Sequence, residues 1–191
     1  MKSTPTMPTR VCLIAVLTAL CLGTNYALIW LPNVKVMDFI VFLAGLNFGI
    51  LVGAATGSLI WVVYGWINPY GVLSLPTWLL ITFGQTMYGV VGGLLGRTTS
   101  WPLRRFSNNF KIELALLGFV LTFLYDLVSN IGFAVTYEIP LIYVLATGWL
   151  VPPWFGIIHE VSNAILFSLA TCPSIKAING LLGGEEHVYE K

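Results

Sequence analysis

The stretch from Val36 to Ile67 reads VMDFIVFLAGLNFGILVGAATGSLIWVVYGWI, and the number of times it crosses a membrane decides the fold. A helix needs about 20 apolar residues to cross the hydrocarbon core of a bilayer. The stretch has 32 residues, which is too long for one crossing and short for two. Its length alone therefore does not decide the number of crossings, which we infer instead from the charged residues on either side of it.

Segments rich in Lys and Arg stay on the cytoplasmic side of a membrane. Two such segments occur, one before the first apolar stretch and one after the apolar stretch that ends near residue 97; their basic residues are Lys2, Arg10, Arg97, Arg104, Arg105 and Lys111. An even number of crossings must separate them, so 36–67 is predicted to cross twice, as a tight hairpin that turns near Phe48–Gly53. On this map eight of the nine basic residues lie inside and only Lys35 lies outside.

The composition supports a membrane location. Of the 191 residues 57% are hydrophobic and only 9% are charged, against about 25% charged residues in ordinary soluble domains. These figures exclude a disordered chain, a nucleic-acid binder and a conventional cytosolic enzyme.

The predicted fold class is an all-α integral membrane protein, with six transmembrane helices in one bundle and both termini cytoplasmic. The helices are expected at about 11–31, 36–50, 53–67, 76–97, 111–135 and 150–172. They form a single domain over residues 1–175, followed by a polar cytoplasmic tail over 176–191.

Polar side chains at membrane depth are costly and need a reason. Three of the expected helices carry them at similar depth, displaced toward the outer side: Gln85 and Tyr88; Thr122, Asp126, Ser129 and Asn130; and His159, Glu160 and Asn163. The second group has i, i+4, i+7, i+8 spacing and shares one helix face. The pattern is typical of a small-molecule site inside a bundle. A hydrogen-bond network that only locks the helices together, or a proton relay, would give the same pattern.

Aromatic and small residues also follow the predicted helices. Five tryptophans fall near the outer helix ends, where they indicate either an interfacial belt or an aromatic pocket: Trp30, Trp66, Trp78, Trp149 and Trp154. Small residues recur every four positions and favour close helix packing: Ala15, Ala19 and Gly23; Gly45, Gly49, Gly53 and Gly57; Gly89 and Gly93; Gly92 and Gly96.

Motifs for catalysis or metal binding are incomplete. His159-Glu160-Val161-Ser162-Asn163 is close to HExxH, but Asn163 replaces the second histidine, so a zinc site would lack its main ligands. The sequence has no GxSxG nucleophile motif and no phosphate-binding loop ending in GK[ST]. We therefore expect neither an enzyme nor a cofactor or metal, and any ATPase that drives transport must be another protein.

Several segments, in order and spacing, carry a family resemblance. They are Ala15-Val-Leu-Thr-Ala19 after a basic start, Leu31-Pro-Asn-Val-Lys35, Phe39 to Gly45 running into Phe48-Gly49, Asn68-Pro69-Tyr70-Gly71, Gly96-Arg97, and Tyr125-Asp126 through Asn130. Over about residues 10–172 the chain resembles the substrate-binding S component of energy-coupling factor (ECF) vitamin transporters.

The resemblance implies a multi-pass protein of a prokaryotic cell membrane that captures a micronutrient from outside. It implies two kinds of partner, a membrane coupling subunit that Ala15 and Ala19 would contact and two cytosolic ATPases. The outer loops at about Pro32–Asp38, Asn68–Thr77 and Tyr137–Pro153 would cover the substrate. The N-terminal histidine motif of nickel and cobalt members is absent, so a metal ion is not the expected substrate. The pocket residues do not match those of the riboflavin, thiamin, biotin or folate members, and the substrate stays open.

The leading hypothesis assigns substrate binding to eleven residues: Asn33, Lys35, Asp38, Asn68, Tyr70, Gln85, Tyr88, Asp126, Asn130, His159 and Asn163. The alternative is an autonomous ion- or proton-coupled carrier, in which Asp126, His159 and Glu160 would titrate during transport. A membrane enzyme acting on lipid and a purely structural subunit are further classes. No class involves nucleic acid.

Overall fold

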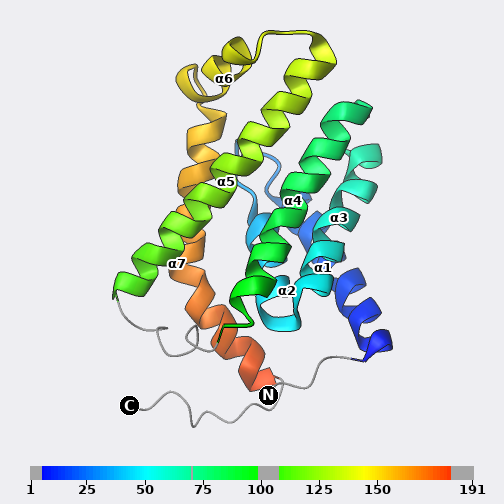
Figure 1. Ribbon diagram of the computed structural model, residues 1–191, viewed down its shortest axis with the longest axis vertical. Coiled ribbons are helices and arrows are strands. Elements are labelled where there is room, and N and C mark those ends of the chain that lie inside the picture. The colour runs from blue at the N-terminus through cyan, green and yellow to red at the C-terminus, as the bar shows by residue number, and fades with distance from the viewer. Residues whose placement is uncertain (1–5, 70, 99–107, 182–191) are drawn as a thin grey trace.

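The computed structural model describes residues 6–69, 71–98 and 108–181, and within them it contains seven helices and no strand. Figure 1 shows the helices gathered into one bundle. Their bounds are α1 Met7–Ala27, α2 Val36–Phe48, α3 Ile50–Ile67, α4 Leu75–Leu95, α5 Asn108–Tyr137, α6 Leu141–Leu150 and α7 Phe155–Leu181.

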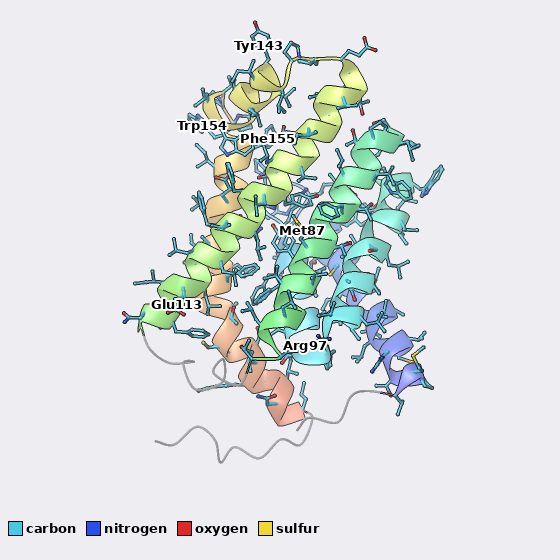
Figure 2. All side chains as sticks on the ribbon, viewed as in Figure 1. Met87, Arg97, Glu113, Tyr143, Trp154 and Phe155 are labelled. Carbon is cyan, nitrogen blue, oxygen red and sulfur yellow. The ribbon has the colours of Figure 1, made fainter. Side chains whose placement is uncertain are left out.

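Five of these helices are long and apolar enough to cross a membrane, namely α1, α3, α4, α5 and α7. Their outward faces carry large apolar side chains, such as Val16, Leu79 and Phe83, that are more than half exposed. Figure 2 shows such side chains projecting outward along the bundle. Lipid is the solvent that suits this surface, so the predicted class, a helical membrane protein, is confirmed. The count of six crossings and the side of each terminus stay predictions.

The helix α2 is too short to cross a bilayer. Its 13 residues span about 20 Å, against a hydrocarbon core of about 30 Å. It ends at Gly49, whose φ of 95° is a conformation that favours glycine, and α3 begins at the next residue. This turn falls within the predicted segment, Phe48–Gly53, but the hairpin has arms of unequal length.

The short α2 changes the place of the first outer loop. Residues 28–35 follow α1 and lead back into the bundle, so α2 begins inside it (Figure 1). Asp38, which we expected at the end of the loop Pro32–Asp38, lies instead in the first turn of α2 and is fully buried.

Two further segments differ from the expectation. The stretch 137–153, expected as a loop, contains α6, a ten-residue apolar helix that follows Pro140 and lies across the end of the bundle. The helix α7 continues to Leu181 and so includes the first residues of the expected tail 176–191. Proline fits before the first turn of a helix, which explains why Glu138-Ile139-Pro140 precedes a helix rather than continuing the loop.

Glycines allow α2, α3 and α4 to meet backbone to backbone. A Cβ atom on Gly53 would lie 2.8 Å from the Cα atom of Gly89, and one on Gly57 would lie 2.8 Å from the carbonyl oxygen of Gln85. Side chains larger than hydrogen have no room at these contacts. Since Trp61 lies one turn after Gly57, this contact also holds the Trp61 side chain beside Gln85.

Candidate functional site

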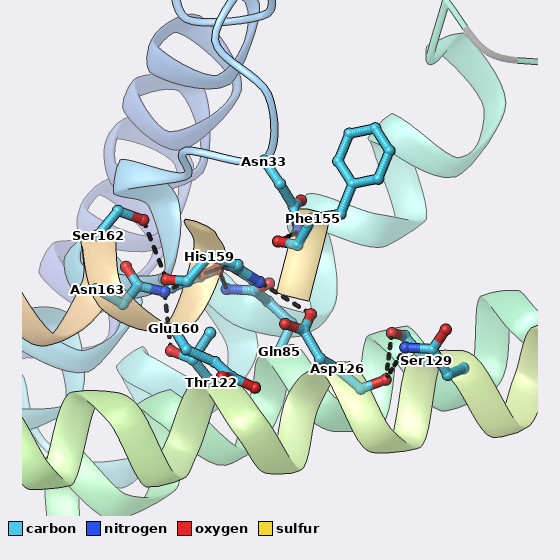
Figure 3. A network of polar contacts seen from close by, with 12 residues as sticks. Asn33, Gln85, Thr122, Asp126, Ser129, Phe155, His159, Glu160, Ser162 and Asn163 are labelled. Atoms are coloured by element: carbon cyan, nitrogen blue, oxygen red, sulfur yellow. Dashed lines mark hydrogen bonds and ion pairs between the residues drawn. The ribbon is translucent and has the colours of Figure 1, made fainter. Parts of the chain in front are cut away.

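The centre of the bundle holds a histidine between two carboxylates. The Nδ1 atom of His159 on α7 lies 2.9 Å from Oδ1 of Asp126 on α5, and its Nε2 atom lies 2.7 Å from Oδ2 of Asp38 on α2. Figure 3 shows the group from close by. A carboxylate only accepts hydrogen bonds, so the two contacts need one proton more than a neutral imidazole carries. With that extra proton on the imidazole, Asp38, Asp126 and His159 together carry one net negative charge.

Asp38 is also bonded by two amide side chains. Gln85 Nε2 donates to its Oδ1 atom at 3.0 Å, and Asn163 Nδ2 donates to its Oδ2 atom at 2.9 Å. Trp61 Nε1 donates in turn to Gln85 Oε1 at 3.2 Å. With the contact from His159, Asp38 thus accepts three hydrogen bonds from two other helices, α4 and α7, which is how a buried charge is kept at low free-energy cost.

The group extends through hydroxyls on α4 and α5. Asn163 Nδ2 also donates to Thr122 Oγ1, which accepts a second hydrogen bond from Tyr88 OH, each at 2.9 Å. We call these eight side chains the polar network: Asp38, Trp61, Gln85, Tyr88, Thr122, Asp126, His159 and Asn163. Together they join α2, α3, α4, α5 and α7.

A cavity of about 610 Å³ lies between the polar network and α6, and we call it the main cavity. Asp126, Ser129 and Asn130 give it polar walls from α5, and Thr147 and Trp149 line it from α6. This volume falls in the range of about 300–1,000 Å³ that small-molecule sites have. Asp126 is 6% exposed and lines the cavity, and its Oδ2 atom has no hydrogen-bond partner among the described residues.

Lys35 separates the main cavity from a second one of about 270 Å³ and lines both. Its Nζ atom lies 5.7 Å from the ring centroid of Trp61 and 5.9 Å from that of Tyr125. Both distances are typical of cation–π contacts. The ammonium group is thus held between two aromatic rings close to Asp38.

Two hydrogen bonds join the wall segments to α7. Trp149 Nε1 on α6 donates to Glu160 Oε1 at 2.7 Å, and Asn33 Nδ2 donates to the carbonyl oxygen of Phe155 at 2.9 Å. The segment before α2 and the helix α6 are both fastened to the start of α7, so one short stretch of α7 positions two walls of the main cavity.

The eleven residues proposed from the sequence fall into four groups. Six belong to the polar network: Asp38, Gln85, Tyr88, Asp126, His159 and Asn163. Three others line the main cavity: Asn33, Lys35 and Asn130. Asn68 lines the second cavity, where its Nδ2 atom donates to the carbonyl oxygen of Gly71. Tyr70 lies outside the described residues.

Sequence reasoning missed Trp61, Tyr125 and the residues of α6. Trp61 had one usable signal, since it is the tryptophan that sits inside an expected helix rather than near a helix end. Three of the five outer tryptophans fit one interpretation each: Trp30 and Trp66 are 72% and 69% exposed, as a belt requires, while Trp149 lines the main cavity.

The acids and the histidine do not form a metal centre within the described part of the chain. The imidazole ring stands between Asp38 and Asp126, so their oxygens do not converge on one point. No family model, curated protein or solved structure matches this chain.

Proposed function

We propose that this chain is the substrate-binding membrane subunit of an ECF-type importer, which captures a vitamin or related micronutrient. The observation that carries the proposal is the main cavity, a space of ligand size lined by Asp126 and by aromatic rings at membrane depth. A network that only locked helices together would need no such space beside it.

The distribution of charge supports an outward-facing site. Arg10, Arg97, Lys111 and Lys176 lie toward the helix ends at the same end of the bundle as the turn at Gly49, opposite the main cavity. With that end in the cytoplasm, the cavity faces the exterior of the cell. The described chain then begins and ends on the cytoplasmic side.

A coupling subunit and two ATPases are the partners in this proposal. Ala15 and Ala19 are exposed on α1, and only 11% of the apolar part of α1 is buried in this chain. We expect Ala15→Leu with Ala19→Leu to abolish co-purification with the coupling subunit while the ligand stays bound. Intact assembly of the double variant would remove α1 as the contact surface.

The proposal is tested by the small molecules that the purified protein retains. We expect mass spectrometry to detect one bound compound in the wild type and a large loss of it in Gly148→Phe. A Cβ atom at Gly148 has only Asn130 Oδ1 nearby, at 3.9 Å, so a phenyl ring there would fill the cavity. The matched control is Gly23→Phe on α1, where the space is open. Equal retention in all three proteins, or none in any, contradicts the proposal.

The second candidate is an autonomous proton-coupled carrier. The contacts of His159 with both Asp38 and Asp126 favour it, because a shared proton between three helices is what such a carrier needs. Uptake into liposomes that contain only this protein and a pH gradient would support it. Uptake that requires the coupling subunit and ATP excludes it.

A further inference from the structure

The main cavity contains an acidic group whose hydrogen-bonding capacity is only half used. Asp126 Oδ1 contacts His159, but Oδ2 has no partner among the described residues, although the side chain is almost fully buried. A buried carboxylate oxygen without a donor is costly. As the side chain lies, Oδ2 has almost no exposed surface, so a donor in the main cavity, which Asp126 lines, reaches that oxygen when the carboxylate turns toward it.

The charges around the cavity favour a positive group. The carboxylates are Asp38, Asp126 and Glu160, and the bases are Lys35 and His159. Carboxylates therefore exceed cations by one even when the imidazole is charged. The described site therefore holds an excess of negative charge among buried side chains, where screening is weaker than at an exposed surface.

The aromatic walls of the cavity are suited to the same kind of group. Trp61 and Tyr125 already hold the ammonium of Lys35 over their faces. Phe133, Trp149 and Phe155 also line the main cavity. Aromatic faces attract cations, and the attraction is strongest where water is excluded.

We infer that the ligand of the main cavity is a small organic cation with N–H groups, such as a protonated amine or amidine, that donates to the carboxylate of Asp126. Its apolar part lies among the aromatic walls. The inference rests on the proposed function, because it concerns the ligand of the same cavity. Lys35 does not select for an anion, because its ammonium is held by two rings and is needed to offset Asp38.

Three probes with one phenyl ring and different charges test this inference on the purified full chain: phenethylammonium, 3-phenylpropanoate and N,N,N-trimethylphenethylammonium. Binding is followed by the change in tryptophan fluorescence, to which Trp61 and Trp149 in the cavity wall contribute. We expect phenethylammonium to bind about tenfold or more tightly than the carboxylate, since a charge-assisted hydrogen bond accounts for such a ratio. The trimethyl compound, which is charged but has no N–H donor, should bind more weakly than phenethylammonium.

Asp126→Asn should abolish the preference for phenethylammonium. Glu113→Gln removes one acid from the other end of α5, about 20 Å away along the helix, and should leave the preference unchanged. The trimethyl comparison uses the unmodified protein, so it holds even if Asp126→Asn fails to fold. Equal or tighter binding of the carboxylate, equal binding of the trimethyl compound, or no binding of any probe up to ~10 mM overturns the inference.

The charge of the retained compound distinguishes failure of the cationic ligand from failure of the proposed function. A retained compound that is anionic and lost in Gly148→Phe upholds the cavity as a ligand site and overturns the cationic ligand. A retained compound with a protonated nitrogen supports both.

Discussion

Replacing Asp38 by asparagine tests whether the polar network holds the bundle together. Asparagine has nearly the same shape but only one acceptor oxygen, whereas three donors converge on the two oxygens of Asp38. If the amide oxygen takes the place of Oδ2, it keeps the hydrogen bonds from His159 and Asn163. The amide nitrogen then faces the donor Nε2 of Gln85, 3.0 Å from the position of Oδ1.

The expected cost follows from these contacts. One charge-assisted hydrogen bond is lost, worth about 1.5–3 kcal/mol, and the two that remain lose their ionic component. We expect Asp38→Asn to lower the free energy of unfolding by about 3–5 kcal/mol, as for other buried charge pairs that lose one partner. Reversible unfolding in mixed detergent and SDS, followed by circular dichroism, measures the change. The control is Glu113→Gln, on the exposed surface, which should change it by about 0.5 kcal/mol or less.

A double variant, Asp38→Asn with Gln85→Met, tests whether the loss comes from the contact between Asp38 and Gln85. Gln85→Met removes the donor that would oppose the new amide, so Asp38→Asn with Gln85→Met should be less destabilised than the sum of the single variants by about 1 kcal/mol or more. Additive losses, or a loss below about 1 kcal/mol in Asp38→Asn alone, would refute the assignment of Asp38 as the centre of the network.

Three further outcomes are expected. Gly57→Leu places a side chain against the α4 backbone and should cost about 2 kcal/mol or more in the same unfolding assay, while Gly23→Leu, in open space, should not. Asn33→Ala removes the hydrogen bond that joins residues 28–35 to the start of α7. In a dissociation experiment this variant should release the ligand about fivefold faster. An unchanged rate argues against this segment as a cavity wall. Trp149→Phe removes the donor to Glu160 and should reduce ligand retention by mass spectrometry; full retention shows that the hydrogen bond does not position α6.

The sequence predicted the helical class and singled out polar residues that the structure buries together, because both follow from local rules. Helix spacing puts Asp126 on the same face as Thr122, and membrane cost singles out His159 and Asn163. Their partner Asp38 could not be placed in the same way, because its depth depends on where α2 begins. The length of 36–67 suggested two equal arms, but the chain turns at Gly49, where φ is 95°, and leaves a first arm of 13 residues.

The walls of the main cavity were the least predictable part. The helix α6 is a short apolar segment after Pro140, and local sequence does not distinguish it from a covering loop. The role of Lys35 likewise depends on Trp61 and Tyr125, which lie on two other helices. Contacts of this kind arise from tertiary packing, which no residue spacing within one helix records.

The shortness of α2 has a consequence for any solute that moves through this protein. Asp126, in the wall of the main cavity, is joined through His159 to Asp38 in the first turn of α2, so a solute held there would lie close to the start of that helix. From there toward its end at Phe48, α2 packs against α4 backbone to backbone at Gly45, Gly92 and Gly96. If the chain moves a solute inward, as we propose, the side-chain-free contact between α2 and α4 is one interface that could separate without repacking any side chain between the two backbones.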